Sequence, residues 1–275
     1  MRYMSKLVIP IGEENFELFR QCGGYYVDKT KFIVELLQDN FKVNLITRPR
    51  RFGKTLAMSM LKNFFDIRKD SKPIFEGLEI TKYEELCKEW MNQWPVLFLS
   101  LKDVANNTFQ GAYDQLVYSI SNLCVEHSYL LESDKVDESD RNRFQRLKDG
   151  EATGVEVRNS LYMLTRMLYM HYGKPVILLI DEYDVPLAKG SEYGYYNEIL
   201  DVIRNLMSTS FKTNDFLKFA VVTGCLRIAK EGIFTGTNHF KSNSIAGKYY
   251  LDSFGFTQDE VEQLLKAAGM SSKNK

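Results

Sequence analysis

Three consecutive residues, Gly53, Lys54 and Thr55, have the types and the order found in phosphate-binding loops. In such a loop, backbone N–H groups and the N-terminus of a helix surround the phosphates of a nucleotide. The lysine reaches the terminal phosphates, and the hydroxyl of Ser or Thr ligates Mg²⁺. An apolar run over residues 43–46 leads into this stretch, and a helical pattern follows it. The order strand, loop, helix that this chemistry requires is therefore present.

The loop departs from the usual G-x-x-x-x-G-K-[ST] pattern, Walker A, because Arg48 occupies the position of the first glycine. Pro49 biases the residue before it toward extended geometry, so we expect Arg48 to close the strand rather than turn the chain. Arg50 and Arg51 add positive charge, which contact with a phosphate would offset. The alternative interpretation is a basic surface turn before a core helix. The residues expected to bind the nucleotide are Arg50, Arg51, Phe52, Gly53, Lys54, Thr55 and Leu56.

A second chemical group lies far downstream, where an apolar run over residues 176–180 ends in the adjacent carboxylates Asp181 and Glu182. Continuous apolar strands are typical of parallel sheets covered on both faces, which bind ligands at the carboxyl ends of their strands. We expect Asp181, a Walker B acid, to hold Mg²⁺ together with Thr55, and Glu182 to be the general base that activates water. The alternative is a buried strand followed by a charged turn. Together with Lys54, the acidic pair favours nucleotide binding.

Two further polar residues follow the apolar run over residues 217–222. Thr223 would end a strand beside the acidic one, where it can contact the γ-phosphate or position the attacking water. Arg227 comes soon after it, and an arginine beside a transferring phosphoryl group stabilises the developing charge. The alternatives are that Thr223 only ends its strand and that Arg227 is a solvated loop residue.

The composition narrows the class of protein. Of 275 residues, 44% are hydrophobic, which is enough for one large α/β domain with a substantial core. The 36 basic and 36 acidic residues cancel, so the net charge does not indicate a nucleic-acid-binding protein. The four cysteines lack paired spacing, which indicates reduced thiols and a cytoplasmic location. No segment is long and apolar enough to cross a membrane, and the N-terminus lacks the apolar core of a signal peptide.

The expected elements alternate between strands and helices, which indicates βαβ units. Strands are predicted over residues 43–47, 96–101, 217–223 and 249–251, with another ending at Asp181. Helices are predicted over residues 54–66, 113–125, 156–171 and 196–210, with a last helix that begins at Thr257. The pattern predicts an α/β fold, a P-loop NTPase with a mainly parallel five-stranded sheet flanked by helices and a small C-terminal helical element.

We expect three parts along the chain. Residues 1–40 form an N-terminal segment packed on the ATPase core, which comprises residues 41–248. Within the core, residues 127–154 are charged and poor in apolar periodicity, so we expect a surface excursion there. Residues 249–275 hold the last strand and the start of the C-terminal helical element.

With these features in view, the chain resembles the bacterial AAA-ATPase-like family, a group of additional-strand P-loop ATPases. The resemblance rests on residues 26–33 (YVDKTKFI), 46–56 (ITRPRRFGKTL), 179–184 (LIDEYD), 223–234 (TGCLRIAKEGIF) and 250–257 (YLDSFGFT). These segments span nearly the entire chain in the expected order. An arginine at position 48 is the family's usual form.

The resemblance implies that Lys54, Thr55, Asp181 and Glu182 are the residues that bind ATP and Mg²⁺. It also implies a partner, because a restriction-like nuclease domain often follows the ATPase domain in this family. The chain ends soon after the last expected helix, so we expect that the nuclease half was removed or that this member lacks it.

The expected activity is Mg²⁺-dependent hydrolysis of ATP to ADP and phosphate, with Lys54, Glu182, Thr223 and Arg227 as the catalytic residues. One alternative is a slow nucleotide-dependent switch that controls a nuclease or another partner protein. A second is an interaction module that does not hydrolyse ATP. The sequence leaves open whether the chain forms a homo-oligomer and whether Arg227 acts within its own subunit.

Overall fold

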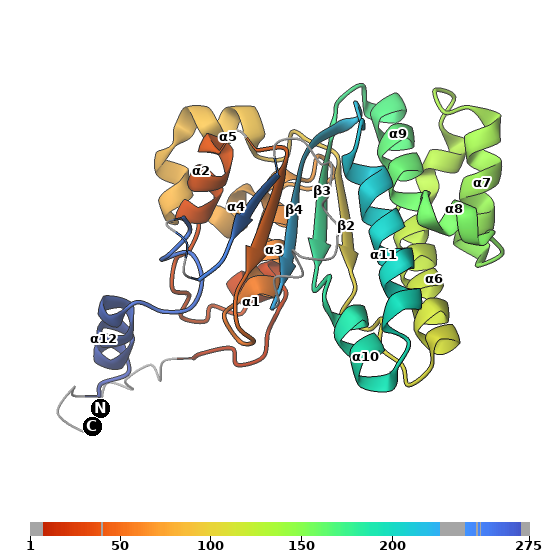
Figure 1. The fold of residues 1–275 in the computed structure, drawn as a ribbon. Helices are drawn as coiled ribbons and strands as arrows, with labels where there is room; N and C mark the ends of the chain where they lie inside the picture. Colours follow the sequence, from red (N-terminus) through yellow and green to blue (C-terminus); the bar gives the residue numbers. More distant parts are fainter. Residues whose placement is uncertain (1–7, 40, 226–239, 246, 248, 271–275) are drawn as a thin grey trace.

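The centre of the molecule is a single sheet of five parallel strands (Figure 1). The computed structural model describes residues 8–39, 41–225, 240–245, 247 and 249–270. The strands are β1 (Val43–Thr47), β2 (Val96–Ser100), β3 (Val176–Asp181), β4 (Leu217–Gly224) and β5 (Phe240–Asn243). Their order across the sheet is β2-β3-β4-β1-β5. The strand β4 therefore lies between the acidic strand β3 and the loop strand β1, and the α/β fold with a parallel five-stranded sheet is confirmed.

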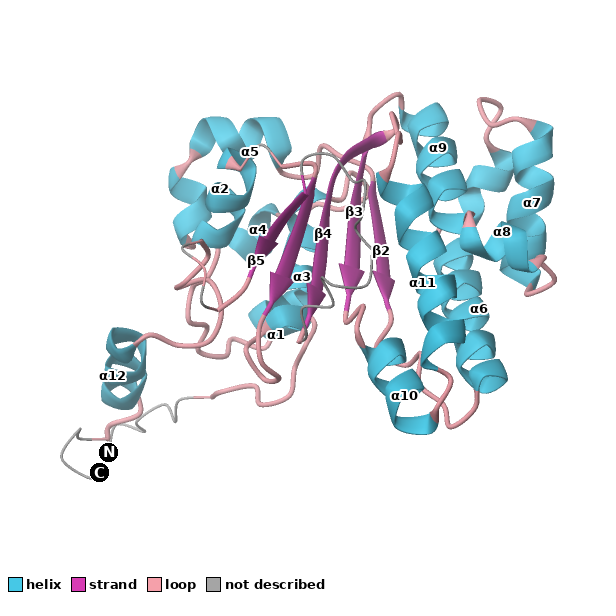
Figure 2. Ribbon diagram, viewed as in Figure 1, coloured by secondary structure: helices cyan, strands magenta, loops and turns pink. Residues whose placement is uncertain are grey.

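Helices cover both faces of this sheet (Figure 2). One layer comprises α6 (Phe109–Glu126), η2 (Ser128–Glu132), α7 (Glu138–Asp149), α8 (Gly154–Arg158), α9 (Ser160–Tyr172) and α11 (Tyr196–Phe211). The other comprises α1 (Phe16–Gln21), α2 (Lys31–Gln38), α3 (Lys54–Phe65), α4 (Lys72–Phe75), η1 (Glu79–Lys82) and α5 (Glu84–Trp90). The remaining helices are α10 (Val185–Tyr193), which follows β3, and α12 (Gln258–Ala267) near the C-terminus. Within the described residues, no helix is both long enough and apolar enough to cross a membrane.

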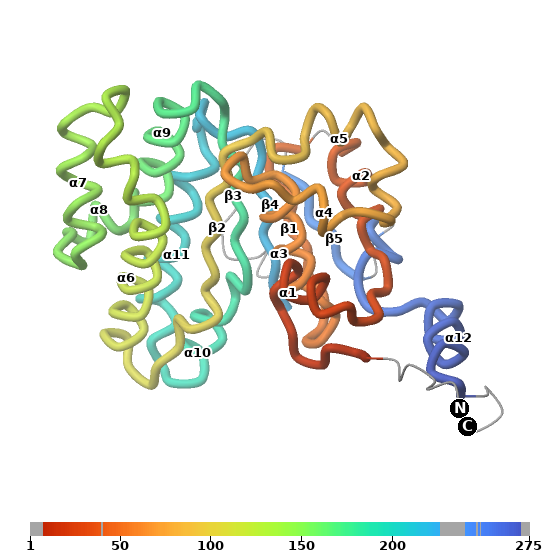
Figure 3. Tube along the Cα trace, turned by 180° about the vertical axis from the view of Figure 1, so that it is seen from behind, coloured from red at the N-terminus to blue at the C-terminus, as the bar shows by residue number. Residues whose placement is uncertain are grey.

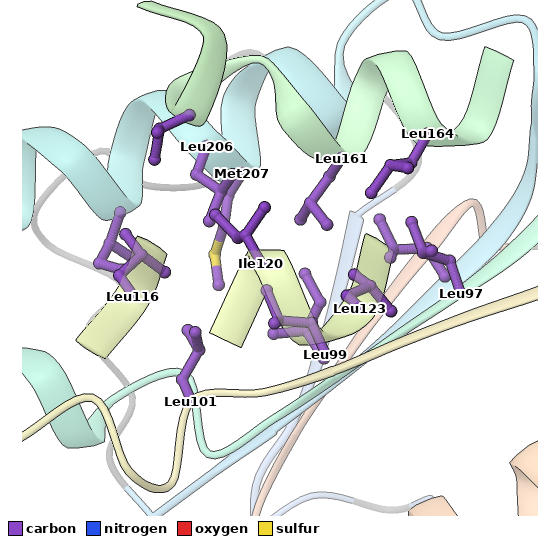
Figure 4. Packing of buried hydrophobic residues seen from close by; sticks show 14 of the residues in the cluster. Leu97, Leu99, Leu101, Leu116, Ile120, Leu123, Leu161, Leu164, Leu206 and Met207 are labelled. Carbon is purple, nitrogen blue, oxygen red and sulfur yellow. The ribbon is translucent and has the colours of Figure 1, made fainter. Parts of the chain in front are cut away.

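Strand β3 shows why the sheet is buried on both faces. All six of its residues are buried, and its side chains alternate between the two helical layers. Leu178 and Ile180 pack in the cluster under α6, α9 and α11, whereas Ile177 and Leu179 pack against α3. In Figure 4, Leu97 and Leu99 of β2 lie in the first cluster with leucines from α6 and α9. Each such fully buried side chain stabilises the fold by about 1.5–3 kcal/mol.

Four of the predicted strands are confirmed within one residue, but the fifth is wrong. The last strand is the short polar segment β5, which pairs with β1 in parallel at the edge of the sheet. Residues 249–251 contain no strand, and Tyr250 has a φ of 55°, which an extended strand excludes. The apolar character of that stretch instead serves packing, since the Tyr250 ring lies 5.2 Å from that of Phe32.

The helices also differ from expectation in two places. Residues 127–154 lie at the periphery but are no mere excursion, because they form η2 and α7 and bury Leu130, Phe144 and Leu147 in the core. Because most residues of α7 are charged or polar, its few apolar residues gave no visible periodicity in the sequence. The helix predicted over residues 156–171 is divided at Asn159 into α8 and α9, and α10 was not predicted. The last predicted helix is confirmed as α12, whose N-cap Thr257 forms a capping box with Glu260.

Candidate active site

The phosphate loop connects the end of β1 with the start of α3. Two of its residues have left-handed backbone conformations, Arg51 with φ 67° and Gly53 with φ 76°. Glycine adopts this conformation without strain, whereas the conformation at Arg51 costs about 1–3 kcal/mol. The side chains of Arg50 and Arg51 are exposed, and α3 begins at Lys54. The loop therefore places two exposed cations beside the N-terminus of a 12-residue helix, an arrangement suited to anions.

Arg48 has a different role from the arginines that follow it. Its backbone N–H donates to the carbonyl of Gly224 at 3.1 Å, which continues the β1–β4 ladder. Its side chain is 2% exposed, and the guanidinium donates to the carbonyls of Thr47 and Asn243, both at 2.9 Å. The expectation that Arg48 closes the strand is confirmed.

Lys54 lies in the interior of the site rather than in solvent. It is 4% exposed, and its ammonium donates to the carbonyl of Pro49 at 3.1 Å and contacts Cys225 Sγ at 3.3 Å. The charge of Lys54 lowers the pKa of both Asp181 and Glu182, opposing the effect of burial on each. Although they are far apart in the sequence, the lysine and the acidic pair therefore share one site.

Asp181 ends β3 and is fully buried. One carboxylate oxygen, Oδ1, accepts a hydrogen bond from the hydroxyl of Thr223, while Oδ2 is buried without a hydrogen-bond partner in the described structure. Burial raises the pKa of Asp181, and the hydroxyls of Thr223 and Thr55 and the ammonium of Lys54 oppose that rise. A buried carboxylate oxygen without a donor is a costly feature that a bound cation would relieve.

Glu182 follows directly and holds a backbone conformation unusual for its residue type, with φ 55°. Burial raises the pKa of its half-buried carboxyl, and repulsion from Asp181 adds to the rise. Lys54 and Lys102 oppose it. Strained backbones of this kind cluster at functional sites, and a carboxyl with a raised pKa is a better general base near neutral pH.

The remaining predicted residues are placed as follows. Phe52 is half-buried and offers its backbone carbonyl to Gly255 at 3.1 Å, while the side chain of Leu56 packs on the apolar cluster around α3. Thr223 binds Asp181. Arg227 lies outside the described residues, so its role stays a prediction.

Sequence reasoning missed three residues at this edge. Lys102 follows β2, forms an ion pair with Glu14 at 2.6 Å, and is close enough to Glu182 to lower its pKa. Cys225 follows β4 and contacts Lys54. The Asp184 carboxylate accepts the backbone N–H of Cys225 at 2.9 Å. The available signal was the same in each case, namely a polar residue just beyond the carboxyl end of an apolar strand.

The donors at this site fit Mg²⁺ better than a metal held entirely by protein. The described residues contain no group of three or more His, Cys, Asp or Glu side chains that could hold a metal ion. Asp181 contributes a carboxylate and Thr55 a hydroxyl, both hard oxygen ligands. Mg²⁺ in phosphate-handling enzymes is typically bound by one or two carboxylates and completed by phosphate oxygens and water.

Similarity to known proteins assigns this chain to a family. An uncharacterized protein in the vnfD 5' region of Azotobacter chroococcum mcd 1 is 28% identical over 261 residues. The alignment covers 94% of this chain but 45% of that protein, so the chain spans less than half of its relative's length. No solved structure matches the chain. A family model described as Predicted AAA-ATPase matches residues 10–234, which include the phosphate loop and the acidic pair, and the chain therefore belongs to this AAA-ATPase-like family.

Proposed function

We propose that this chain binds ATP and hydrolyses it to ADP and phosphate in a Mg²⁺-dependent reaction. The observation that carries the proposal is the convergence of Lys54 with Asp181 and Glu182 at the carboxyl edge of the sheet. A lysine at the start of a helix suits the binding of terminal phosphates, and adjacent carboxylates suit a metal ion and a base.

Thr55 and Asp181 would hold Mg²⁺. The buried Oδ2 of Asp181, which has no hydrogen-bond partner in the described structure, supports this assignment. When bound, Mg²⁺ would neutralise charge on the phosphate oxygens. Thr223 fixes the orientation of the Asp181 carboxylate through the hydrogen bond to Oδ1.

The chain's own residues account for the other requirements of the reaction. Glu182 accepts a proton from water, whose oxygen forms a bond to the γ-phosphorus as the bond to the β–γ bridging oxygen breaks. Lys54 stabilises negative charge on the terminal phosphates. Arg50 and Arg51 are exposed beside the loop and can contact phosphate oxygens, and Arg227 is proposed to assist.

A slow nucleotide-dependent switch that controls a nuclease or another protein is the second candidate. Lys102 is compatible with it, because its positive charge offsets part of the rise in the pKa of Glu182 that burial and Asp181 cause. The greater length of the Azotobacter relative is compatible with an effector that lies outside the aligned region. The two functions differ in turnover rate, not in the nucleotide site.

Thermal unfolding with and without Mg²⁺ and ATP, combined with a phosphate-release assay, tests the proposal. At an ATP concentration 100 times the Kd, binding should stabilise the native state by about 2.7 kcal/mol. Omission of Mg²⁺ should abolish phosphate release. Unchanged unfolding at millimolar ATP and Mg²⁺ would favour an interaction module instead, while binding followed by less than one turnover per minute would favour the switch.

A further inference from the structure

A segment after the sheet lies directly against the phosphate loop. We call residues 249–256 the strap. Arg48 donates through Nη2 to the carbonyls of Tyr249 at 3.3 Å and Tyr250 at 3.0 Å. A second link joins the backbone N–H of Gly255 to the carbonyl of Phe52 at 3.1 Å. Both ends of the strap are therefore bonded to residues of the loop.

The Arg48 link is strong and depends on one side chain. The buried guanidinium has four backbone carbonyls as partners, and its central carbon lies 5.3 Å from the centre of the Phe254 ring. Among the described residues it forms no ion pair, and burial lowers the pKa of Arg48. A lysine keeps the charge but has no planar fork of donors, so it cannot reproduce this arrangement.

The Phe52 link depends on the conformation of the loop. Phe52 lies between Arg51 and Gly53, the two loop residues with left-handed backbones. The direction of its carbonyl is therefore set by the turn whose N–H groups would face the phosphates. Gly255 itself has φ 74°, and a Cβ added there would lie 3.0 Å from the Phe52 ring, so the contact is close.

The strap in turn positions α12. The helix begins after Thr257, has no buried residue, and stands away from the sheet (Figures 1 and 3). Lys29 holds this region from the other side, with bonds to the Asp252 carbonyl at 2.7 Å and to Glu260 at 2.6 Å. Because α12 contributes no buried residue to the core, its position depends on the strap and on the Lys29–Glu260 ion pair.

We propose that Arg48 and Phe52 couple nucleotide occupancy of the loop to the order of the strap and α12. The inference rests on the proposed nucleotide site and adds an output to it. A loop closed on phosphates fixes the Phe52 carbonyl and the Arg48 guanidinium, which stabilises the strap. Because coupling between two sites is reciprocal, an ordered strap strengthens nucleotide binding by the same factor. Arg48 acts as a positioning residue, not as a phosphate ligand.

Amide hydrogen exchange on the full chain, with and without Mg²⁺ and the non-hydrolysable analogue adenylyl imidodiphosphate, tests the coupling. In the wild type, the nucleotide should slow exchange over residues 249–267 by about fivefold or more, the lower bound of a typical coupling. In Arg48→Lys, exchange over these residues should be faster than in the wild type, and the ratio between the free and bound states should shrink toward one, while Tyr250 still packs on Phe32. Nucleotide affinity should fall by a similar factor. If Arg48 only attached the strap and did not couple it to the nucleotide, exchange in Arg48→Lys would be faster with and without nucleotide, and the ratio between these two rates would stay at the wild-type value. That result would overturn the proposal.

Two further variants make the result decisive. Gly255→Ala strains the second link without altering Arg48, so it should also reduce the ratio between exchange without and with nucleotide. This variant replaces Arg48→Lys in the test if Arg48→Lys does not fold. Glu260→Gln loosens α12 from Lys29 but leaves the loop contacts intact, so the ratio over residues 249–256 and the nucleotide affinity should stay at wild-type values. Wild-type binding of the analogue without any change in strap exchange overturns the coupling alone. Failure of the wild type to bind overturns the proposed function with it.

Discussion

Buried polar groups serve opposite purposes in two regions of this molecule. Beside η2, the Tyr129 hydroxyl joins His127 Nδ1 and the Tyr172 hydroxyl, each at 3.1 Å. At the carboxyl edge of the sheet, Asp181 Oδ2 is buried and has no hydrogen-bond partner in the described structure, whereas Tyr129 and Tyr172 are half-buried. Glu182 beside it has a strained backbone. The polar groups of the first region satisfy one another, whereas the second leaves a buried carboxylate oxygen without a donor among the described residues.

The difference separates a region that stabilises the fold from a region suited to binding a ligand. Burial lowers the pKa of His127 to about 3, so its imidazole is neutral and acts within the network at physiological pH. Burial instead raises the pKa of Asp181, which disfavours the charged form that a cation needs. Evolved sites commonly keep such unfavourable features because ligand binding relieves them. Substitutions should therefore lower stability in the network and lower function at the edge.

The largest effect is expected for Glu182→Gln. Removal of the general base should slow ATP hydrolysis by about 10²–10⁴-fold while nucleotide binding persists, because the amide cannot accept the proton from water. Steady-state phosphate release and a binding titration measure the two quantities. Glu192→Gln is the matched control, since Glu192 pairs with Lys189 on the exposed side of α10. Hydrolysis by Glu182→Gln at the wild-type rate would show that the base assignment is wrong.

Lys54→Ala should weaken ATP binding by about 10–100-fold, the loss expected for a charged hydrogen bond of about 1.5–3 kcal/mol. Isothermal titration with Mg²⁺ and ATP measures the change. Lys62→Ala on the same helix is the control, because the Lys62 ammonium pairs with Glu126 at 3.0 Å and lies 5.3 Å from the centre of the Phe98 ring, and it contacts none of the proposed phosphate-binding residues in the described structure. Equal losses in both variants would contradict a phosphate role for Lys54.

Tyr129→Phe tests the other side of the comparison. It leaves His127 and Tyr172 without their shared partner and should destabilise the protein by about 1–3 kcal/mol, with no effect on the rate of ATP hydrolysis per folded molecule. Urea denaturation and phosphate release measure both. Tyr118→Phe, at a tyrosine that is 63% exposed, should leave stability unchanged. A catalytic defect in Tyr129→Phe would remove the distinction between the two regions.

The smallest effect is expected for Asp181→Asn, with a sign opposite to that of a lost contact. Because folding raises the pKa of Asp181, the unfolded chain releases its proton first as pH rises, and the wild type loses stability between acidic and neutral pH. Asparagine does not ionise, so the variant should be more stable by about 1 kcal/mol at neutral pH and equal to the wild type at pH 3.

Urea denaturation at the two pH values, with and without Mg²⁺ and ATP, measures this effect. The ligand should stabilise the wild type but not Asp181→Asn. Asp201→Asn, at an exposed position of α11, is the control. A variant that is less stable than the wild type at neutral pH would refute the view that the Asp181 carboxylate is unfavourable until a ligand binds.

Local sequence determined the parts of the site that lie within one strand, loop or helix. Gly53, Lys54 and Thr55 follow an apolar strand, and Asp181 and Glu182 end another, so their place at the carboxyl edge followed from strand direction alone. Strands β1 and β3 are short, rich in apolar residues and buried along their whole length, so burial dominates their choice of structure. These features could be predicted because each depends on neighbours in the sequence.

Contacts between distant segments decided the rest. The short strand β5 has a single apolar residue, Phe240, too few for an apolar pattern, and it forms because its backbone pairs with β1. The role of Arg48 depends on carbonyls 195 and 202 residues away, and the Thr223 hydroxyl meets Asp181 across 42 residues. The residue types in the sequence indicated which chemistry this protein is suited to. Tertiary structure alone decided which buried polar groups found hydrogen-bond partners and which did not, because the choice of partner depends on three-dimensional proximity.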